Sequence, residues 1–415
     1  MSHFVFIESN TTGTGRLAVE RLLAQGDQVT FITRQPRKYP FLNSSAAGLR
    51  VLEVETNDVA AVKASVRELQ RRATPDALVT FSTFYVPTVA EVAADSGFRY
   101  LNPRTALDCH DKYRSRQVLR GAGLPTPDFW LVTTDEELLR VSETARYPCV
   151  VKPIAESGSN GVRLVNDREE FLAHARMLRA RRVNEREQPL EGHLLIESLL
   201  SGPEFSVETI TLGPGRTHVI GVTAKHLSTP PHFVEMGHDF PADLEPKARQ
   251  ALEEATVAAL DAVGFDWGPA HTELRFTPTG PVVVEINPRL AGGMIPELVR
   301  YATGIDQLTV MLDMLLGKPV SLQATRQEYA AIRFLTAPRR GRITRVSGVE
   351  EARRLPGVRD VSVDKGVGSV VRFPENAIDR LGFVIASSPH RAEVIAGVNQ
   401  ARALIELQLE DVKDA

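Results

Sequence analysis

The sequence predicts an α/β protein (α+β overall), and three observations carry this prediction. Apolar runs alternate with amphipathic runs over residues 3–83, which is typical of parallel strands covered by helices. A loop rich in glycine and serine separates two β-branched runs between residues 150 and 165. From residue 193 onward, strand-like segments outnumber helical ones, which indicates largely antiparallel sheets.

The composition is that of a folded protein with several units. The chain has 415 residues, of which 43% are hydrophobic and 24% charged, and this length exceeds one ordinary core. The net charge of −3 gives no electrostatic reason to expect nucleic acid or a membrane surface as a partner. Cys109 and Cys149 lack metal-ligand spacing and suit a reducing compartment. No segment has the length of a spanning helix or the pattern of a secretion signal, so we expect a cytoplasmic protein.

Residues 1–105 are expected to form a Rossmann-like domain with a parallel sheet. The turn Gly13-Thr14-Gly15 lies where a dinucleotide-binding fingerprint would begin. However, Ala18 stands at the third glycine position, and the next strand ends in Thr33-Arg34, without an acid for a ribose. A structural turn is therefore favoured over a cofactor site, with part of a small substrate as the alternative occupant.

Three further units are expected after residue 105. Residues 106–192 contain the glycine-rich loop and end in a polar segment, 183–192, which we interpret as a linker. Residues 193–325 are strand-rich, and residues 326–415 form a C-terminal α+β extension. Single helices are predicted over 104–124 and 295–317.

The loop that follows Lys152-Pro153 is either a flexible turn or a lid over phosphates. Its residues are Ser157, Gly158, Ser159, Asn160 and Gly161. The spacing is not that of a P-loop, because Lys152 precedes the glycines and no Gly-Lys-Ser/Thr follows them. The loop alone does not decide between the two interpretations.

A hairpin over residues 271–289 predicts a cation site. We expect a three-residue turn at 278–280 that pairs Thr277 with Pro281 and brings Glu273 opposite Glu285. Like charges placed side by side destabilise a sheet unless something compensates them. Asn287 projects from the same face as Glu285. Three oxygen ligands without a thiol or clustered histidine favour Mg²⁺ shared with phosphates, over a solvated hairpin edge.

The ordered motifs resemble the ATP-grasp superfamily from about residue 111 to residue 305. They are DKYRSRQVL at 111–119, VVKP with the loop that follows, IESLLSGPEFSVE at 196–208, and HTEL and EINPR in the hairpin. The resemblance implies an ATP-grasp fold. It also implies that ATP and Mg²⁺ bind, with Mn²⁺ as a possible substitute.

The resemblance also implies a role for individual residues. Lys112 and Lys152 match the lysines that touch the nucleotide, and the loop 157–161 matches the cover over its β- and γ-phosphates. The segment Glu197-Ser198-Leu199-Leu200 looks like the adenine-binding hinge, and Glu204 like the ribose ligand. The magnesium ligands and the residue that steadies the transferred phosphoryl group match Glu273, Glu285, Asn287 and Arg289.

Within the superfamily the chain looks most like the L-amino-acid ligases, the dipeptide-forming group related to bacilysin synthetase. Residues 221–242 and the tail from Ala330 carry this closer likeness. In those ligases the Glu and His of a V-E-x-G-H stretch line the amino-acid site, which here matches Glu235 and His238. In the family, the glycine-rich turn after the arginine can carry a bulky residue that limits the size of the substrate pocket. Here the turn reads Leu290-Ala291-Gly292-Gly293-Met294, so the resemblance implies no side-chain preference.

The resemblance implies an ATP-dependent ligase that forms an amide bond through an acyl phosphate. Its substrates would be a small carboxylic acid or amino acid and an amine, and Lys152 and Arg289 would act in catalysis. A homodimer is expected, since the family commonly forms one. Two alternatives stay open: a carboxylase or purine-pathway type of enzyme that activates bicarbonate or formate, and a nucleotide-binding regulatory protein without catalysis.

Overall fold

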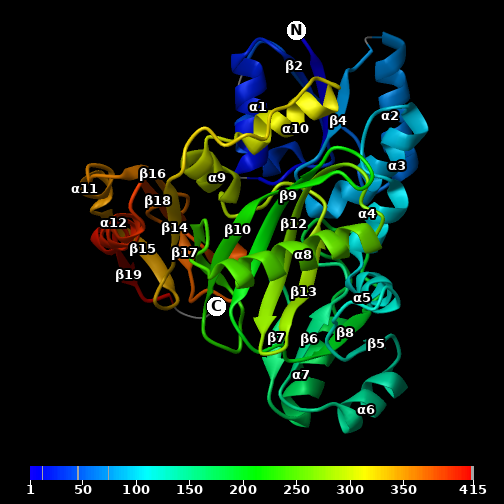
Figure 1. The fold of residues 1–415 in the computed structure, drawn as a ribbon, viewed down its shortest axis with the longest axis vertical. Helices are drawn as coiled ribbons and strands as arrows, with labels where there is room; N and C mark the ends of the chain where they lie inside the picture. The colour runs from blue at the N-terminus through cyan, green and yellow to red at the C-terminus, as the bar shows by residue number, and fades with distance from the viewer. Residues whose placement is uncertain (12, 44–45, 73, 413–415) are drawn as a thin grey trace.

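The N-terminal part of the chain forms a parallel four-stranded sheet, as predicted. The computed structural model describes residues 1–11, 13–43, 46–72 and 74–412 (Figure 1). The sheet has the order β3-β2-β1-β4. Its strands are β1 (His3–Ile7), β2 (Gln28–Thr33), β3 (Leu49–Glu53) and β4 (Ala77–Val79), and its helices are α1 (Thr14–Ala24), α2 (Val59–Arg72) and α3 (Val86–Ser96). The strand order reverses between β1 and β4, so a crevice is expected at the carboxyl ends of these two strands.

The predicted helix over 104–124 is two helices, α4 (Pro103–His110) and α5 (Lys112–Gly121). Asp111 between them has extended backbone angles, and its carboxylate accepts hydrogen bonds from the backbone of Tyr113 and Arg114. This N-cap starts a new helix where sequence periodicity alone continues the old one. As a result, Lys112 stands at the first position of α5.

A small antiparallel sheet carries the glycine-rich loop. Its order is β5-β8-β6-β7. The strands are β5 (Phe129–Val132), β6 (Cys149–Pro153), β7 (Arg163–Val165) and β8 (Leu194–Ser198), and α6 (Asp135–Thr144) and α7 (Arg168–Arg179) pack on the sheet. The loop joins β6 to β7. Because β8 pairs within this sheet, the unit extends to Ser198 rather than ending at residue 192. We call residues 129–198 the lid unit.

The segment 183–192 is not the open linker that its polar composition suggested. Val183 and Pro189 pair in an isolated β-bridge, so residues 183–189 form a small hairpin. Polar residues predict exposure to water, but they serve equally well in a hairpin that makes polar contacts with another part of the chain.

An eight-stranded antiparallel sheet forms the centre of the molecule. Its order is β13-β12-β9-β10-β11-β14-β18-β16. The strands are β9 (Glu204–Thr211), β10 (Thr217–Leu227), β11 (Glu235–Phe240), β12 (Gly268–Thr277), β13 (Gly280–Asn287), β14 (Tyr329–Leu335), β16 (Val358–Val363) and β18 (Gly382–Ser388). Helix α8 (Pro246–Ala262) lies across β10, β12 and β13 (Figure 1). The predicted C-terminal extension therefore continues the central sheet.

The remaining elements attach the outer parts to this sheet. The predicted helix over 295–317 is broken at Gly304, which has a φ of 80°, into α9 (Ile295–Thr303) and α10 (Gln307–Leu315). Helix α10 packs its leucines against the N-terminal domain beside α1 (Figure 1). The C-terminal part adds α11 (Val349–Arg353), α12 (Arg391–Leu404) and a sheet of β17 (Val370–Val371), β15 (Gly341–Ser347) and β19 (Glu406–Glu410). Among the described residues, no helix has the length and apolarity needed to cross a membrane.

Candidate active site

The two carboxylates of the β12–β13 hairpin lie opposite each other, as predicted. Glu273 pairs with Glu285 in the sheet register. The predicted turn is wrong, however, because Thr277 pairs with Gly280 and the loop has two residues rather than three. A β-bulge between Glu273 and Leu274 shifts the register again and offsets the first error.

The bulge is held in place by a side chain from another unit. The register passes over Val284, whose carbonyl oxygen accepts a hydrogen bond of 2.7 Å from Arg116 Nη2 of α5. Bulges commonly redirect side chains next to active sites. Here the bulge turns Glu285 toward the face that Glu273 occupies.

Two lysines neutralise the carboxylate pair. Lys112 Nζ lies 3.0 Å from Glu285 Oε1, and Lys225 Nζ lies 2.8 Å from Glu273 Oε1. Lys112 Nζ also donates a hydrogen bond of 2.6 Å to the Glu156 carbonyl oxygen, just before the glycine-rich loop. The like charges of the hairpin are therefore compensated, as their juxtaposition requires.

Lys225 is the more buried of these two lysines. Its side chain is 1% exposed, and its ammonium contacts Glu204 at 3.1 Å and Glu235 at 2.9 Å in addition to Glu273. Burial alone would lower the pKa of Lys225, but Glu235, Glu273 and Glu204 raise it well above its usual value. Lys225 is thus a fixed positive charge that joins three carboxylates.

Lys152 belongs to a second buried charge cluster. Its Nζ lies 2.5 Å from Glu197 Oε2, and Arg116 Nε lies 2.6 Å from Glu197 Oε1. Burial lowers the pKa of Lys152, and the Glu197 carboxylate opposes this effect. Burial alone would raise the pKa of Glu197, but Arg116 and Lys152 hold it at about 2. The Glu197 carboxylate therefore orients Lys152 toward the cavity described next.

Most of the predicted site residues line a single cavity of about 290 Å³. All four parts of the chain line it: Asn10 and Thr83, the lid unit, the central sheet, and Ala377 with Arg380. The predicted residues on its wall are Lys112, Lys152, Ser157, Gly158, Ser159, Asn160, Glu197, Leu199, Leu200, Glu204, Glu235, Glu273, Glu285, Asn287, Arg289, Gly292 and Gly293.

Two predicted site residues do not line the cavity. Gly161 packs against the side chains of Pro153 and Leu178, and its carbonyl oxygen bonds to the His174 ring. His238 is fully buried, and a Cβ atom on Gly293 would lie 2.7 Å from its Nε2. His238 therefore lies behind Gly293 rather than on the wall itself.

Comparison with known proteins accounts for this arrangement. Residues 145–297 match the model of the ATP-grasp domain, and residues 333–410 match the model of the L-amino acid ligase C-terminal domain 2. The chain thus contains an ATP-grasp domain followed by an L-amino acid ligase C-terminal domain.

Two relatives and one solved structure show how far the likeness extends along the chain. Protein y4rH of Sinorhizobium fredii is 28% identical over 414 residues, which cover 100% of this chain and 84% of that protein. The alanine–anticapsin ligase of Bacillus subtilis is 27% identical over 267 residues, covering 60% of this chain and 55% of that ligase. The crystal structure of an L-amino acid ligase from Bacillus licheniformis superposes with a TM-score of 0.85 at 24% identity, covering 99% of both chains.

The glycine-rich loop of this ATP-grasp protein rests on two neighbouring segments. Ser159 Oγ donates a hydrogen bond of 3.0 Å to the Phe233 carbonyl oxygen, and the Ala377 amide donates one of 3.2 Å to the Gly158 carbonyl oxygen. Gly158 has a φ of 65° and Ser159 a φ of 61°. The loop therefore lies over the cavity and contacts the C-terminal part of the chain.

Arg289 is anchored by the N-terminal domain. Its Nε donates a hydrogen bond of 2.6 Å to Thr83 Oγ1, and its Nη2 donates one of 3.3 Å to Asn287 Oδ1. Burial lowers the pKa of Arg289, and Glu285 opposes this effect. The guanidinium is thus held beside the carboxylate hairpin by contacts from two units.

Glu235, which contacts Lys225, also contacts a cation from the C-terminal part of the chain. Arg380 Nη1 lies 3.3 Å from Glu235 Oε2, and its guanidinium stacks 4.0 Å from the centroid of the Phe334 ring. Neither ring nitrogen of His238 has a hydrogen-bond partner among the residues that the structure describes, and burial lowers the pKa of His238 to about 3. His238 is therefore a neutral ring that faces Phe334 edge-on.

Sequence reasoning missed Lys225, Arg116 and Arg380. Lys225 stands within the apolar run of β10, where an unpaired ammonium would be costly, and this signal was available in the sequence. Arg116 resembles a solvated residue of a charged helix, yet its side chain is fully buried. Arg380 lies in a loop, and only the fold brings it to the cavity.

The depressed pKa of Glu197 predicts an acid-dependent contribution to stability. Because the folded pKa of about 2 lies below the ordinary value of 4.5, the ionised carboxylate stabilises the fold fully above pH 4.5. This stabilisation is lost as the pH falls through 4.5 toward 2. Glu197→Gln is therefore expected to reduce the free energy of unfolding most at neutral pH, with a difference from wild type that shrinks below pH 4.5.

Urea unfolding at about pH 7 and about pH 3.5 measures this difference. The exposed variant Glu143→Gln on α6 is the control, and it should match wild type at both pH values. An equal loss of stability in Glu197→Gln at the two pH values would contradict the assigned ion cluster.

Proposed function

We propose that the protein joins the carboxylate of an L-amino acid or another small carboxylic acid to the amine of a second amino acid, with ATP converted to ADP and phosphate. The observation that supports this most is the shared ammonium of Lys225. It contacts Glu273 of the proposed metal set at 2.8 Å and Glu235 of the proposed substrate set at 2.9 Å. The two sets are thus adjacent in one cavity, as transfer between a nucleotide and a bound acid requires.

The donor set of the hairpin fits Mg²⁺, or Mn²⁺ in its place. Glu273, Glu285 and Asn287 offer oxygen atoms only, and Mg²⁺ typically uses one or two carboxylates together with phosphates. Among the residues that the structure describes, no group of three His, Cys, Asp or Glu side chains is placed to hold a metal. The remaining ligands would therefore be phosphate and water oxygens. A cation bound there would neutralise charge on the transferred phosphoryl group.

The nucleotide would be held by the predicted residues of three segments. Lys112 and Lys152 would contact its phosphates, and the loop 157–161 would cover them with backbone amides and hydroxyls. Leu199 and Leu200 lie on the cavity wall directly after Glu197, where the adenine is expected, and Glu204 lies where the ribose is expected. The covering loop would also exclude water from a reactive acyl phosphate.

The proposed reaction has two steps. A carboxylate oxygen of the first substrate attacks the γ-phosphorus, ADP leaves, and Arg289 stabilises the charge on the transferred group. The amine nitrogen of the second substrate then attacks the acyl carbon and loses a proton, and phosphate leaves as the amide forms. Glu235 would bind the ammonium of an amino acid, since a carboxylate partly buried beside a cavity suits a positive group.

A substitution at Gly293 tests whether the glycine-rich turn after Arg289 forms part of the amino-acid site. At a φ of +58°, Gly293→Ala would strain the backbone and place a methyl group 2.7 Å from His238 Nε2. We expect the KM for the amino-acid substrate to rise about tenfold or more while the KM for ATP changes little. Gly366→Ala is the control, because Gly366 is exposed outside the cavity and a methyl group there meets nothing within 4 Å. Equal effects of the two variants on the amino-acid KM would contradict this wall.

The experiment that tests the function is a screen of ADP and phosphate release over pairs of amino acids and small carboxylic acids, with mass measurement of the product. We expect release to require a pair, with an amide as the product. Turnover stimulated by bicarbonate alone would favour the carboxylase alternative, and nucleotide binding without stimulated turnover would favour a regulatory protein. The expected homodimer stays a prediction that light scattering in solution measures.

A further inference from the structure

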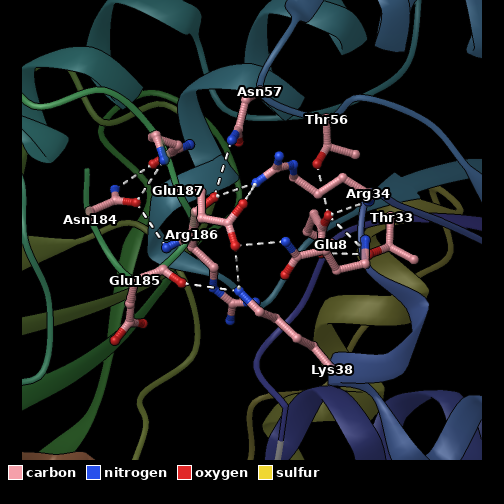
Figure 2. Close-up of polar contacts among 12 residues, drawn as sticks. Glu8, Thr33, Arg34, Lys38, Thr56, Asn57, Asn184, Glu185, Arg186 and Glu187 are labelled. Atoms are coloured by element: carbon pink, nitrogen blue, oxygen red, sulfur yellow. Dashed lines mark hydrogen bonds and ion pairs between the residues drawn. The ribbon is translucent and has the colours of Figure 1, made fainter. Parts of the chain in front are cut away.

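Hydrogen bonds between its own residues fix the shape of the hairpin 183–189. Asn184 Oδ1 accepts hydrogen bonds from the backbone amides of Arg186 at 2.8 Å and Gln188 at 3.0 Å. The Asn184 amide bonds to the Gln188 carbonyl oxygen at 3.0 Å, and Glu187 has a φ of 60°. The hairpin therefore presents Arg186 and Glu187 in defined directions, as Figure 2 shows.

The hairpin docks on the N-terminal domain where the strand order reverses. Arg186 Nη2 donates a hydrogen bond of 2.8 Å to the carbonyl oxygen of Ser9, after β1. Gln188 Nε2 donates one of 3.4 Å to the carbonyl oxygen of Phe84, after β4. In sheets of this kind, ligands bind in the crevice at the carboxyl ends of these two strands. Here the chain's own hairpin packs against one side of that crevice, and Asn10 and Thr83 on its other side line the cavity.

Charged side chains fix the hairpin from a second direction. Arg34 Nη1 lies 2.6 Å from Glu187 Oε2 (Figure 2). Gln35 Nε2 donates a hydrogen bond of 2.7 Å to Glu187 Oε1. Lys38 Nζ lies 3.8 Å from Glu187 Oε1 and donates a hydrogen bond of 3.3 Å to the carbonyl oxygen of Glu185. The residues that follow β2 thus bind the acidic side chain of Glu187 at the tip of the hairpin.

A buried acid of the N-terminal domain makes this docking site electrostatically specific. Glu8 is 2% exposed and has a φ of 53°. Its carboxylate accepts hydrogen bonds from the hydroxyls of Thr33, Thr56 and Tyr39. Tyr39 Oη in turn accepts a hydrogen bond of 2.9 Å from Arg186 Nη1. Because a buried carboxylate needs compensation, Arg186 supplies positive charge to Glu8 through Tyr39.

The hairpin is also joined to the glycine-rich loop within the lid unit. Arg181, two residues before the hairpin, donates a hydrogen bond of 2.7 Å from Nη2 to Glu156 Oε1. Glu156 directly precedes the loop, and Asn160 Nδ2 bonds back to its carboxylate at 3.4 Å. A continuous set of contacts therefore runs from the N-terminal domain through the hairpin to the loop.

We propose that the hairpin 183–189 is a latch by which the N-terminal domain holds the glycine-rich loop closed, and that Glu187 is a positioning residue for ligation. Arg186 itself lines the cavity. The ligation part rests on the proposed function. Glu187 does not line the cavity, so it acts on the reaction through the position of the lid unit. With the latch broken, the loop opens more often, and water competes with the amine for the acyl phosphate.

The test uses a charge swap across the contact. Glu187→Arg places a cation against Arg34 and Lys38, and Arg34→Glu combined with Glu187→Arg restores opposite charges at this pair. Both are made in a Glu55→Gln background, because Glu55 Oε1 lies 3.0 Å from Arg34 Nε and would repel the new carboxylate. Glu143→Arg is the matched control, because it makes the same charge change on α6 of the lid unit, where its weak partner is Arg168 at 3.7 Å. Hydrogen exchange is measured at residues 156–161 with the nonhydrolysable analogue AMP-PNP and Mg²⁺, and the ratio of ADP to amide is measured with substrates.

We expect exchange at 156–161 in Glu187→Arg to be about tenfold faster than in wild type, as expected for the loss of a charge-assisted contact. Exchange within β5, β6 and β8 should be unchanged. The double variant should return exchange to within about twofold of wild type, and Glu143→Arg should equal wild type. The ADP-to-amide ratio should rise in Glu187→Arg and fall again in the double variant.

Three results would overturn the latch. They are wild-type exchange at 156–161 in Glu187→Arg, a double variant as fast as Glu187→Arg, and faster exchange throughout the lid unit, which indicates a merely structural contact. If wild type forms no amide with any substrate pair, the proposed function fails, and the exchange measurement still decides on the latch.

Discussion

Glu285→Gln is expected to lower the rate of Mg²⁺-dependent ADP release by about 100-fold or more, because it removes one of two carboxylates of the proposed cation site. The amide of Gln keeps the shape of the side chain and can still accept a hydrogen bond from Lys112. Half-maximal turnover should also require a higher Mg²⁺ concentration. The measurement is initial ADP release as a function of Mg²⁺.

Two controls separate this effect from loss of the fold. The thermal midpoint without ligand should change little, and Glu143→Gln, an exposed acid on α6, should leave the Mg²⁺ dependence of wild type intact. If Glu285→Gln turns over with the Mg²⁺ dependence of wild type, the hairpin is not the cation site. The carboxylate pair would then serve only the cationic side chains that contact it, Lys112, Lys225 and His271.

Arg289→Lys is expected to lower kcat by about 1,000-fold, since an arginine that stabilises a transferred phosphoryl group typically contributes this much. The affinity for the nucleotide should change by less than about threefold, because the loss falls on the transition state rather than on binding. Single-turnover ADP formation and binding of a fluorescent nucleotide measure the two quantities.

A substitution at Thr83 tests the same role of Arg289 with a smaller expected effect on kcat. Thr83→Val removes the hydrogen bond of 2.6 Å to Arg289 Nε and leaves the guanidinium in place. We expect a smaller loss in kcat, about tenfold, as for a group that orients a catalytic residue. A kcat for Arg289→Lys equal to that of wild type would show that Arg289 has no role in phosphoryl transfer.

The carboxylate hairpin was predictable because its partners are close in sequence. Two strands joined by a short turn leave few possible registers, and Glu285 within an apolar run had to find compensation. The pairing of Glu273 with Glu285 was correct although the turn was not, since a bulge offset the error. Bulges depend on tertiary contacts such as that of Arg116 with Val284, which local pattern does not reveal.

Contacts between distant segments were not predictable in the same way. Arg186 and Glu187 lie in a polar stretch whose composition is equally typical of a linker and of a hairpin that docks on another unit. Glu8 stands at the polar end of an apolar run, and no pattern in the sequence shows that it is buried and connected to Arg186 through Tyr39. The pattern of a segment reports the exposure expected of that segment alone, whereas Arg186 and Glu187 contact residues that lie 147 to 177 positions away.

The central claim is that a carboxylate is activated as an acyl phosphate in this cavity, and oxygen transfer tests it most directly. The acid substrate is labelled with ¹⁸O at both carboxylate oxygens, and the released phosphate is analysed by mass. The account predicts one labelled oxygen in each phosphate and the other in the amide product. Phosphate without label, formed together with ADP and amide, would contradict the account.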